Sequence, residues 1–472
     1  MSSEPELNPP PHGFRIIPCT GVDLFLRHRM APMGLIINAR LDPSIMEATL
    51  WTLVEHKFPR AGARVACRNG IYELQIPDVF DIRNPPFVFT VENHPEMYHR
   101  DGRPEIPLGL TGSKPCVTPD PELAWLFQNP TCPRSLDDFI RSNVPSVHIY
   151  VTVFDDLTFL GFLAPHIMID GIGIVTLLDA WTRLVRGDDI DTIRGMEWDA
   201  QPLAHFSSGP VKSDVPRGFF RPSSPLGLQE TQEATPDELD PKDIPRFKIM
   251  DELQAQGSVE CVGSADVLSA WWLKTVYGDR RLTDHTPIHI HMYRNLRDMP
   301  IFANDAPLAK PYIHNLILTS AVLPIPASAF QTESLGALAL RIRRSIVAYN
   351  SDLEAICADL RWMCAGSGSN ALEVLHWCPP GAEWVLQTNL RFGKLAELDF
   401  SGAVVGHAPK AAARVVFFYP FLITNPPSAF RGVEGVLMED ADVVWMRIGV
   451  RAKAVFGLQP ISFINVAQVW HM

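Results

Sequence analysis

A stretch without periodicity divides this 472-residue chain. From about Phe206 to Pro245 the sequence "FSSGPVKSDVPRGFFRPSSPLGLQETQEATPDELDPKDIP" is rich in proline, serine and acidic residues. Such a composition is typical of a linker, and a chain of this length is too long for one compact core. We therefore predict an N-terminal domain over residues 1–205, a crossover linker over 206–245 and a C-terminal domain over 246–472.

Both halves of the chain mix helical and strand patterns. In the first half, alternation and β-branched residues predict a strand in "SVHIYVTVFDD". The segment "LTFLGFLAPHIMI" is its expected hairpin neighbour, with the Asp155-Asp156 turn between them. The segment "GIVTLLDAWTRLVRG", which comes after these strands, has helical spacing. The segment "SIMEATLWTLVEHKF", which comes before them, also has helical spacing, and Ser44 is its expected N-cap. In the second half, "SADVLSAWWLKTVYG" has helical spacing, whereas "PIHIHMYRNL", "HNLILTSAVLPI" and "WVLQTNL" alternate as strands do. The patterns predict two α+β domains.

Charge and composition exclude several classes of protein. The formal net charge is −12, which argues against nucleic acid or an anionic membrane as a partner. The N-terminus shows no signal peptide, and no uncharged apolar run reaches the roughly 18 residues that span a bilayer. The eight cysteines contain no CxxC spacing, which favours free thiols over a metal site or a disulfide framework. We expect a cytoplasmic monomer without a bound metal.

One polar pair interrupts the apolar run "APHIMIDGIG", Ala164 to Gly173. His166 is predicted near the end of a buried strand, with Asp170 and Gly171 in the strand-to-helix turn and the helix starting near Ile174. A buried histidine beside an ordinary Asp-Gly turn explains these residues without any activity. Alternatively, an imidazole that is neutral near pH 7 accepts a proton from a substrate. The pattern alone leaves both interpretations open.

Further short motifs occur in a fixed order along the chain. They are "TGVD", "FPRAGARV", "HIMIDG", "SADVLSAWWLK", "NLRDMP", "YIHN" and "DFSGA" (Asp399 to Ala403). Together they resemble the motifs of BAHD-type acyl-CoA-dependent acyltransferases, in which the third is HxxxDG and the last is DFGWG. The resemblance is strongest to fungal members such as the trichothecene acetyltransferases, and it covers nearly the whole chain.

The resemblance implies a fold, a reaction and roles for residues. The fold is two chloramphenicol-acetyltransferase-like α+β domains, with mixed sheets flanked by helices and an active-site channel at their interface. His166 acts as general base while an alcohol of an apolar secondary metabolite attacks the acyl-CoA thioester, without an acyl-enzyme. Asp170 is structural and faces Arg297, which stabilises the turn that carries His166. Acyl-CoA is a co-substrate, and no cofactor is bound.

The sequence departs from the family at two places. "DFSGA" lacks the first glycine and the tryptophan of DFGWG, and Asp399 is expected to support the architecture away from His166. Plant members carry Thr-Ser-Trp where this chain has Thr388, Asn389 and Leu390. The indole donor is absent, so Thr388 or Asn389 either donates to the oxyanion or merely continues a strand.

Binding of CoA has weaker candidates. Ser264 begins a predicted helix, and a helix N-terminus with a hydroxyl suits a phosphate. Arg294, Lys410 and Arg414 are further basic residues that could contact the CoA phosphates. An ordinary N-cap explains Ser264 equally well, and solvated surface charges explain the three basic residues. His289 and His291 share one face of a strand, but no third metal ligand has matching spacing, and His314 is interpreted as a packing or surface residue.

Three alternatives to CoA-dependent acyl transfer remain. Condensation-type enzymes share HxxxDG and take acyl groups from carrier proteins, but they usually carry a second histidine where this chain has Pro165. A member recruited as a cyclase or pericyclic catalyst would fit the weak DFSGA motif and the missing indole. An inactive binding protein is disfavoured by the intact His166, Asp170, Gly171 and Arg297.

Overall fold

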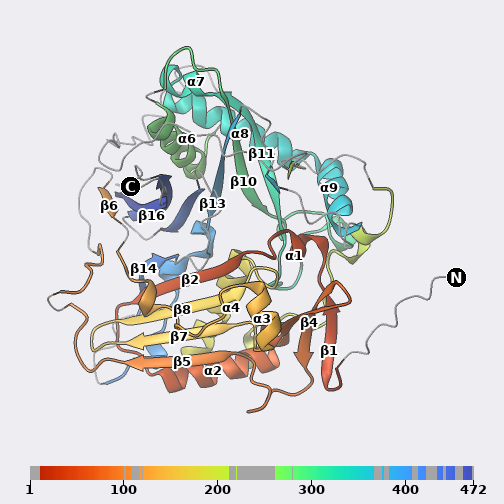
Figure 1. The fold of residues 1–472 in the computed structure, drawn as a ribbon, viewed down its shortest axis with the longest axis vertical. Coiled ribbons are helices and arrows are strands. Elements are labelled where there is room, and N and C mark those ends of the chain that lie inside the picture. Colours follow the sequence, from red (N-terminus) through yellow and green to blue (C-terminus); the bar gives the residue numbers. More distant parts are fainter. Residues whose placement is uncertain are drawn as a thin grey trace.

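The fold is built on two mixed sheets, with helices packed against each (Figure 1). The computed structural model describes residues 11–99, 102–108, 116–119, 121–211, 219–220, 261–278, 280–365, 375–376, 382–406, 413–420, 433–439, 443–451 and 461–469. The predicted α+β class, with mixed sheets flanked by helices, is confirmed. Among the described residues, no helix is long and apolar enough to cross a bilayer.

The first sheet has five strands in the order β14-β2-β8-β7-β5. All of its pairs are antiparallel except β5 with β7. Helix α4 packs on helix α2, and Figure 1 shows both beside this sheet. The bounds are β2 Met30–Ile37, β5 Val88–Asn93, β7 His148–Val153, β8 Thr158–Pro165, β14 Val415–Tyr419, α2 Pro43–His56 and α4 Gly171–Val185. Strand β8 is buried along its whole length, which explains its nearly continuous apolar sequence.

The second sheet has seven strands in the order β11-β10-β13-β15-β16-β17-β6. Strand β13 is parallel to both neighbours, and the other pairs are antiparallel. Helices α6 and α8 pack together and form a second apolar core with this sheet. The bounds are β6 Cys116–Pro119, β10 Pro287–Asn295, β11 Ile317–Pro326, β13 Glu383–Asn389, β15 Val433–Glu439, β16 Val443–Arg451, β17 Ile461–Val469, α6 Ser264–Tyr277 and α8 Leu335–Ser351.

The smaller elements complete the described chain. Strands β1, β4 and β3 form an antiparallel sheet, and β9 pairs with β12. The bounds are β1 Phe14–Pro18, α1 Gly21–Phe25, β3 Arg64–Arg68, β4 Ile71–Pro77, α3 Leu136–Ser142, β9 Phe219–Phe220, α7 Ala327–Thr332, α9 Leu353–Ala365 and β12 Leu375–His376.

The two large sheets exchange one strand each. Strand β14 comes from the C-terminal half of the chain but pairs with β2, and β6 comes from the N-terminal half but pairs with β17. The ranges 1–205, 206–245 and 246–472 remain predictions, and most of the predicted linker lies outside the described residues.

Two helix starts differ from the sequence prediction. Helix α2 is capped by Asp42, whose carboxylate accepts from the Ser44 N–H at 2.8 Å, so Ser44 lies inside the first turn and not at the N-cap. Helix α4 begins at Gly171 rather than near Ile174, because Asp170 caps it by accepting from the Gly173 N–H at 2.7 Å. In both helices an aspartate that precedes the predicted first residue accepts a hydrogen bond from a backbone N–H group of the first turn.

Candidate active site

His166 follows the last residue of β8 and is partly exposed between buried neighbours. Its backbone N–H donates to the carbonyl of Arg29 at 2.8 Å, which ties it to the residue that precedes β2. The end of β8 therefore places a partly exposed imidazole beside buried residues.

Asn315 fixes the orientation of this imidazole. Its Nδ2 donates to the carbonyl of His166 at 2.7 Å and to Asp23 Oδ1 at 3.4 Å. Because both partners are acceptors, Asn315 Oδ1 must be the atom that lies 3.2 Å from His166 Nδ1. An amide oxygen accepts, so Nδ1 carries the proton and the Nε2 lone pair remains available. Burial lowers the pKa of His166, which keeps the imidazole neutral at pH 7.

Asp23 itself is held by the "TGVD" motif. Its carboxylate accepts from the backbone N–H and the hydroxyl of Thr20, each at 2.8 Å. Burial raises the pKa of Asp23, although these hydrogen bonds and the one from Asn315 oppose the rise. Hydrogen bonds thus connect the N-terminal motif to His166 through Asp23 and Asn315.

Asp170 and Arg297 form a buried bidentate ion pair. The two guanidinium nitrogens donate to the two carboxylate oxygens at 2.9 and 3.0 Å. Asp170 also accepts from the Leu316 N–H at 3.0 Å. Arg297 donates further to the carbonyls of Tyr312 and His314, at 2.9 and 2.7 Å. The pair therefore joins the turn after His166 to the loop between β10 and β11. Both carboxylate oxygens of Asp170 are engaged in these structural hydrogen bonds.

Both glycines near the turn have close neighbours, and backbone atoms exclude any side chain at Gly173. A Cβ on Gly171 would lie 2.8 Å from the Leu390 side chain. A Cβ on Gly173 would overlap the carbonyl of Ile313. The HxxxDG turn thus packs between the end of β13 and the β10–β11 loop.

Thr388 and Asn389 end β13, and both are partly exposed. Leu390, at the position where the resemblance places a tryptophan, packs on Gly171, so this segment lies beside the HxxxDG turn. Asn389 Oδ1 accepts from the Arg391 N–H at 3.0 Å. This bond uses the amide oxygen and not the Nδ2 donor, so Thr388 and Asn389 both remain candidate oxyanion donors.

The DFSGA segment lies at the opposite end of α4. A Cβ on Gly402 would overlap the carbonyl of Val185, the last residue of that helix. Asp399 accepts from the Ser401 N–H at 3.0 Å and pairs with Arg414 at 3.2 Å. Asp399 is therefore separated from His166 by the length of a 15-residue helix.

Ser264 is the first residue of α6 and accepts from Arg391 at 3.0 Å. Arg391 also pairs with Glu439 at 2.8 Å, and Arg343 of α8 lies 4.0 Å from Asp266 in the first turn of α6. Two arginines thus converge on this helix N-terminus. Arg391 was not predicted; its position one residue after Leu390 is the only indication the sequence offers.

Arg294 lies elsewhere, in a groove of about 710 Å³ beside α4. It pairs with Asp298 at 3.1 Å, and its Nε is buried without a hydrogen-bond partner in the described part of the chain. The groove is lined by α4 residues from Ile172 to Arg183, by Tyr293 to Asn295 of β10 and by residues 392–394. The structure does not bring Arg294 to Ser264. Lys410 lies outside the described residues.

The three other histidines considered from the sequence are buried. His289, His291 and His314 are each 4% exposed or less, and burial lowers the pKa of His314 well below its usual value. His314 is thus a packed residue, and its carbonyl binds Arg297. In the described ranges, no group of three or more His, Cys, Asp or Glu side chains has the geometry of a metal site.

Comparison with known proteins gives the class. The chain is 25% identical over 470 residues to acetyltransferase adrJ of Penicillium roqueforti, covering 90% of each chain. It is also 25% identical to a Penicillium decumbens protein named transcriptional regulator calD, covering 95% and 97% of the two chains. No family model matches the chain.

Solved structures share the fold. TRI101 of F. sporotrichioides, complexed with coenzyme A and T-2, superposes with a TM-score of 0.54 at 13% identity over 96% of this chain and 94% of that one. Vinorine synthase superposes with a TM-score of 0.52 at 15% identity, covering 98% and 93%. The chain therefore has the fold of these BAHD-type structures, and fungal proteins named acetyltransferase are among its relatives. The predicted resemblance to the fungal branch of these enzymes is confirmed.

Proposed function

We propose that this chain transfers an acyl group from acyl-CoA to a hydroxyl of an apolar small molecule, with His166 as the general base. The observation that carries the proposal is the hydrogen bond from His166 Nδ1 to Asn315 Oδ1. It leaves the Nε2 lone pair of a neutral imidazole for the alcohol proton. Relatives named acetyltransferase support the same chemistry.

The reaction needs no covalent enzyme intermediate. The hydroxyl proton passes to His166 Nε2 as the alcohol oxygen bonds to the thioester carbonyl carbon. The tetrahedral oxyanion then collapses, the C–S bond breaks, and the imidazolium returns the proton to the departing sulfur. Ester and free CoA are the products, and His166 is neutral again. Thr388 or Asn389 is the donor we assign to the oxyanion, a role typically worth about 2.7–4 kcal/mol of barrier.

The N-terminus of α6 is the site we assign to a CoA phosphate. Ser264 offers a hydroxyl and the helix a positive dipole end, and Arg391 and Arg343 add charge. Asp266 in the same turn and Glu439, which pairs with Arg391, carry the opposite charge, so the phosphate would compete with them for the arginines. TRI101 structures contain CoA, which supports a CoA site in this fold.

DNA binding, which the name of calD suggests, is disfavoured for this chain. The net charge of −12 opposes binding to phosphates, and His166, Asp170, Gly171 and Arg297 form a complete HxxxDG site. We therefore propose enzymatic acyl transfer in secondary metabolism, by a cytoplasmic monomer.

The test is release of free thiol from acetyl-CoA and longer acyl-CoAs in the presence of a panel of polycyclic and aliphatic alcohols. His166→Ala should abolish release and keep the thermal unfolding temperature. Arg391→Gln should raise the KM for acyl-CoA and leave kcat nearly unchanged. If no donor releases thiol and CoA does not shift the unfolding temperature, the proposal is wrong.

A further inference from the structure

A second charged side chain lies beside His166. The β2–β8 ladder pairs Met30 with Pro165, so Arg29, one residue earlier, lies opposite His166. The backbone hydrogen bond from His166 to Arg29 extends the ladder to this pair. Opposite residues of antiparallel strands project to the same side of the sheet, with Cβ atoms about 4.5–5.5 Å apart. Arg29 and His166 therefore share one side of the sheet end.

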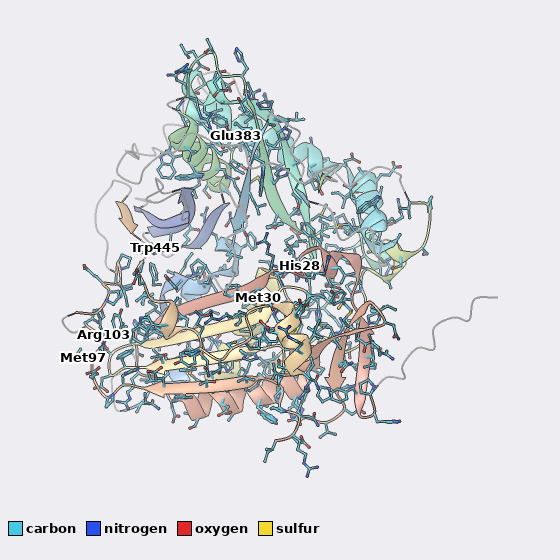
Figure 2. All side chains as sticks on the ribbon, in the orientation of Figure 1. His28, Met30, Met97, Arg103, Glu383 and Trp445 are labelled. Atoms are coloured by element: carbon cyan, nitrogen blue, oxygen red, sulfur yellow. The ribbon has the colours of Figure 1, made fainter. Side chains whose placement is uncertain are left out.

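This position is the junction between the two large sheets. Figure 2 labels His28 and Met30, the neighbours of Arg29, where the five-stranded sheet meets the upper part of the molecule. Arg29 interacts electrostatically with Tyr293 of β10, which lines the groove beside α4. Arg29, which is not itself among the groove's lining residues, thus lies near Tyr293 in the wall of that groove.

The charge of Arg29 acts on the base. Arg29 is only partly exposed, and burial lowers its pKa, so water screens its charge incompletely. Burial and, more weakly, the Arg29 charge lower the pKa of His166. During acyl transfer His166 becomes positively charged, and Arg29 opposes that charge. A substrate anion bound to Arg29 would cancel the repulsion at the moment the imidazolium forms.

We propose that Arg29 binds a carboxylate of the acceptor, and that the acceptors are hydroxy acids. The inference rests on the proposed acyl transfer at His166. A guanidinium offers two parallel N–H donors that match a carboxylate. Because Arg29 and His166 are direct neighbours, the carboxylate lies within a few bonds of the reacting hydroxyl. The acyl transfer itself is unchanged: the carboxylate stays intact, and the products are an acyloxy acid and free CoA.

The experiment compares β-hydroxydecanoate with its methyl ester, each with acetyl-CoA, by thiol release. The wild-type KM for the acid should be roughly tenfold or more below that for the ester, as for a hydrogen bond between charged groups. Arg29→Gln should raise the KM of the acid to that of the ester, so that the difference in KM between acid and ester disappears. Arg29→Lys should keep part of the difference. Arg281→Gln, at an exposed position, is the matched control and should keep all of it.

A binding measurement gives a readout independent of turnover. By calorimetry, β-hydroxydecanoate should bind the His166→Ala protein and lose roughly tenfold in affinity in the Arg29→Gln, His166→Ala protein. Thermal unfolding checks that each variant is folded.

Three results would overturn the inference. They are equal KM values for acid and ester in the wild type, an equal fall of kcat for both in Arg29→Gln, and turnover of neutral alcohols such as decanol without turnover of the acid. In the third case acyl transfer stands and the acceptor class is wrong. Absence of thiol release with every alcohol overturns the proposed function as well.

Discussion

Asn315 is the residue on which the orientation of the proposed base depends. It binds both the ring and the carbonyl of His166, and Asp23 holds its amide. Asn315→Ala should lower kcat by about 10- to 100-fold with little change in KM, because the ring loses its fixed tautomer. Steady-state kinetics measure this, with thermal unfolding as the check on folding. A variant with wild-type kcat would remove Asn315 from the mechanism.

The pH dependence of activity reports the same imidazole. Burial, then the Arg29 charge, lowers the pKa of His166, whereas Asp170 and Asn315 raise it. The neutral base exists above its pKa, so kcat/KM should rise with pH through a midpoint below 6.5 and then level off. Arg29→Gln removes a positive charge and should move this acid limb to higher pH, as should Asn315→Asp, which adds a negative one. An acid limb above pH 6.5 in the wild type would contradict the assignment.

At the scale of elements, the start of α4 depends on one ion pair. Asp170→Ala leaves the largely buried guanidinium of Arg297 without its carboxylate. The expected loss of unfolding free energy is about 3 kcal/mol, at the low end for a broken buried pair, because Arg297 keeps carbonyl partners at Tyr312 and His314. The matched control Arg183→Ala breaks a pair that is about one-third exposed, with Asp188, and should cost less than about 1 kcal/mol. Urea unfolding of both variants measures the difference.

The predictable elements are those whose pattern is local. The β7–β8 hairpin and the position of His166 after a buried strand follow from the alternation in β7, the Asp155-Asp156 turn and the apolar run of β8, which are adjacent in the chain. The role of Asn315 could not be predicted, because it depends on a loop 149 residues away that folds against β8. The N-cap of α2 was missed for a smaller reason: Ser44 and Asp42 are both good caps, and only the backbone conformation selects Asp42.

At the scale of the whole molecule, the halves of the chain complete one another. Phe417 and Phe418 of β14 are buried, and this strand covers the edge of β2. A fragment of residues 1–205 lacks β14 and should expose that edge, which favours aggregation. We expect it to aggregate alone and to become soluble when residues 246–472 are co-expressed. A soluble fragment in which the β2 amides resist hydrogen exchange would show that the exchanged strand is dispensable.

Buried histidines make the whole fold sensitive to acid. Burial lowers the pKa of His148 to about 4 and also lowers the pKa values of His166, His289 and His314. On unfolding these groups regain a pKa near 6.5, so the unfolded chain binds more protons, and stability is lost as pH falls from about 6.5 toward 4.

His148→Asn tests this sign away from the proposed active site. The variant should lose less unfolding free energy than the wild type between pH 6.5 and about 4, whatever its stability at neutral pH. Asp23 and Asp266, whose pKa values burial raises, act in the opposite direction in both proteins. The difference between the two proteins therefore isolates the His148 contribution. Parallel stability curves in urea titrations across this range would show that His148 is accessible to protons in the folded state.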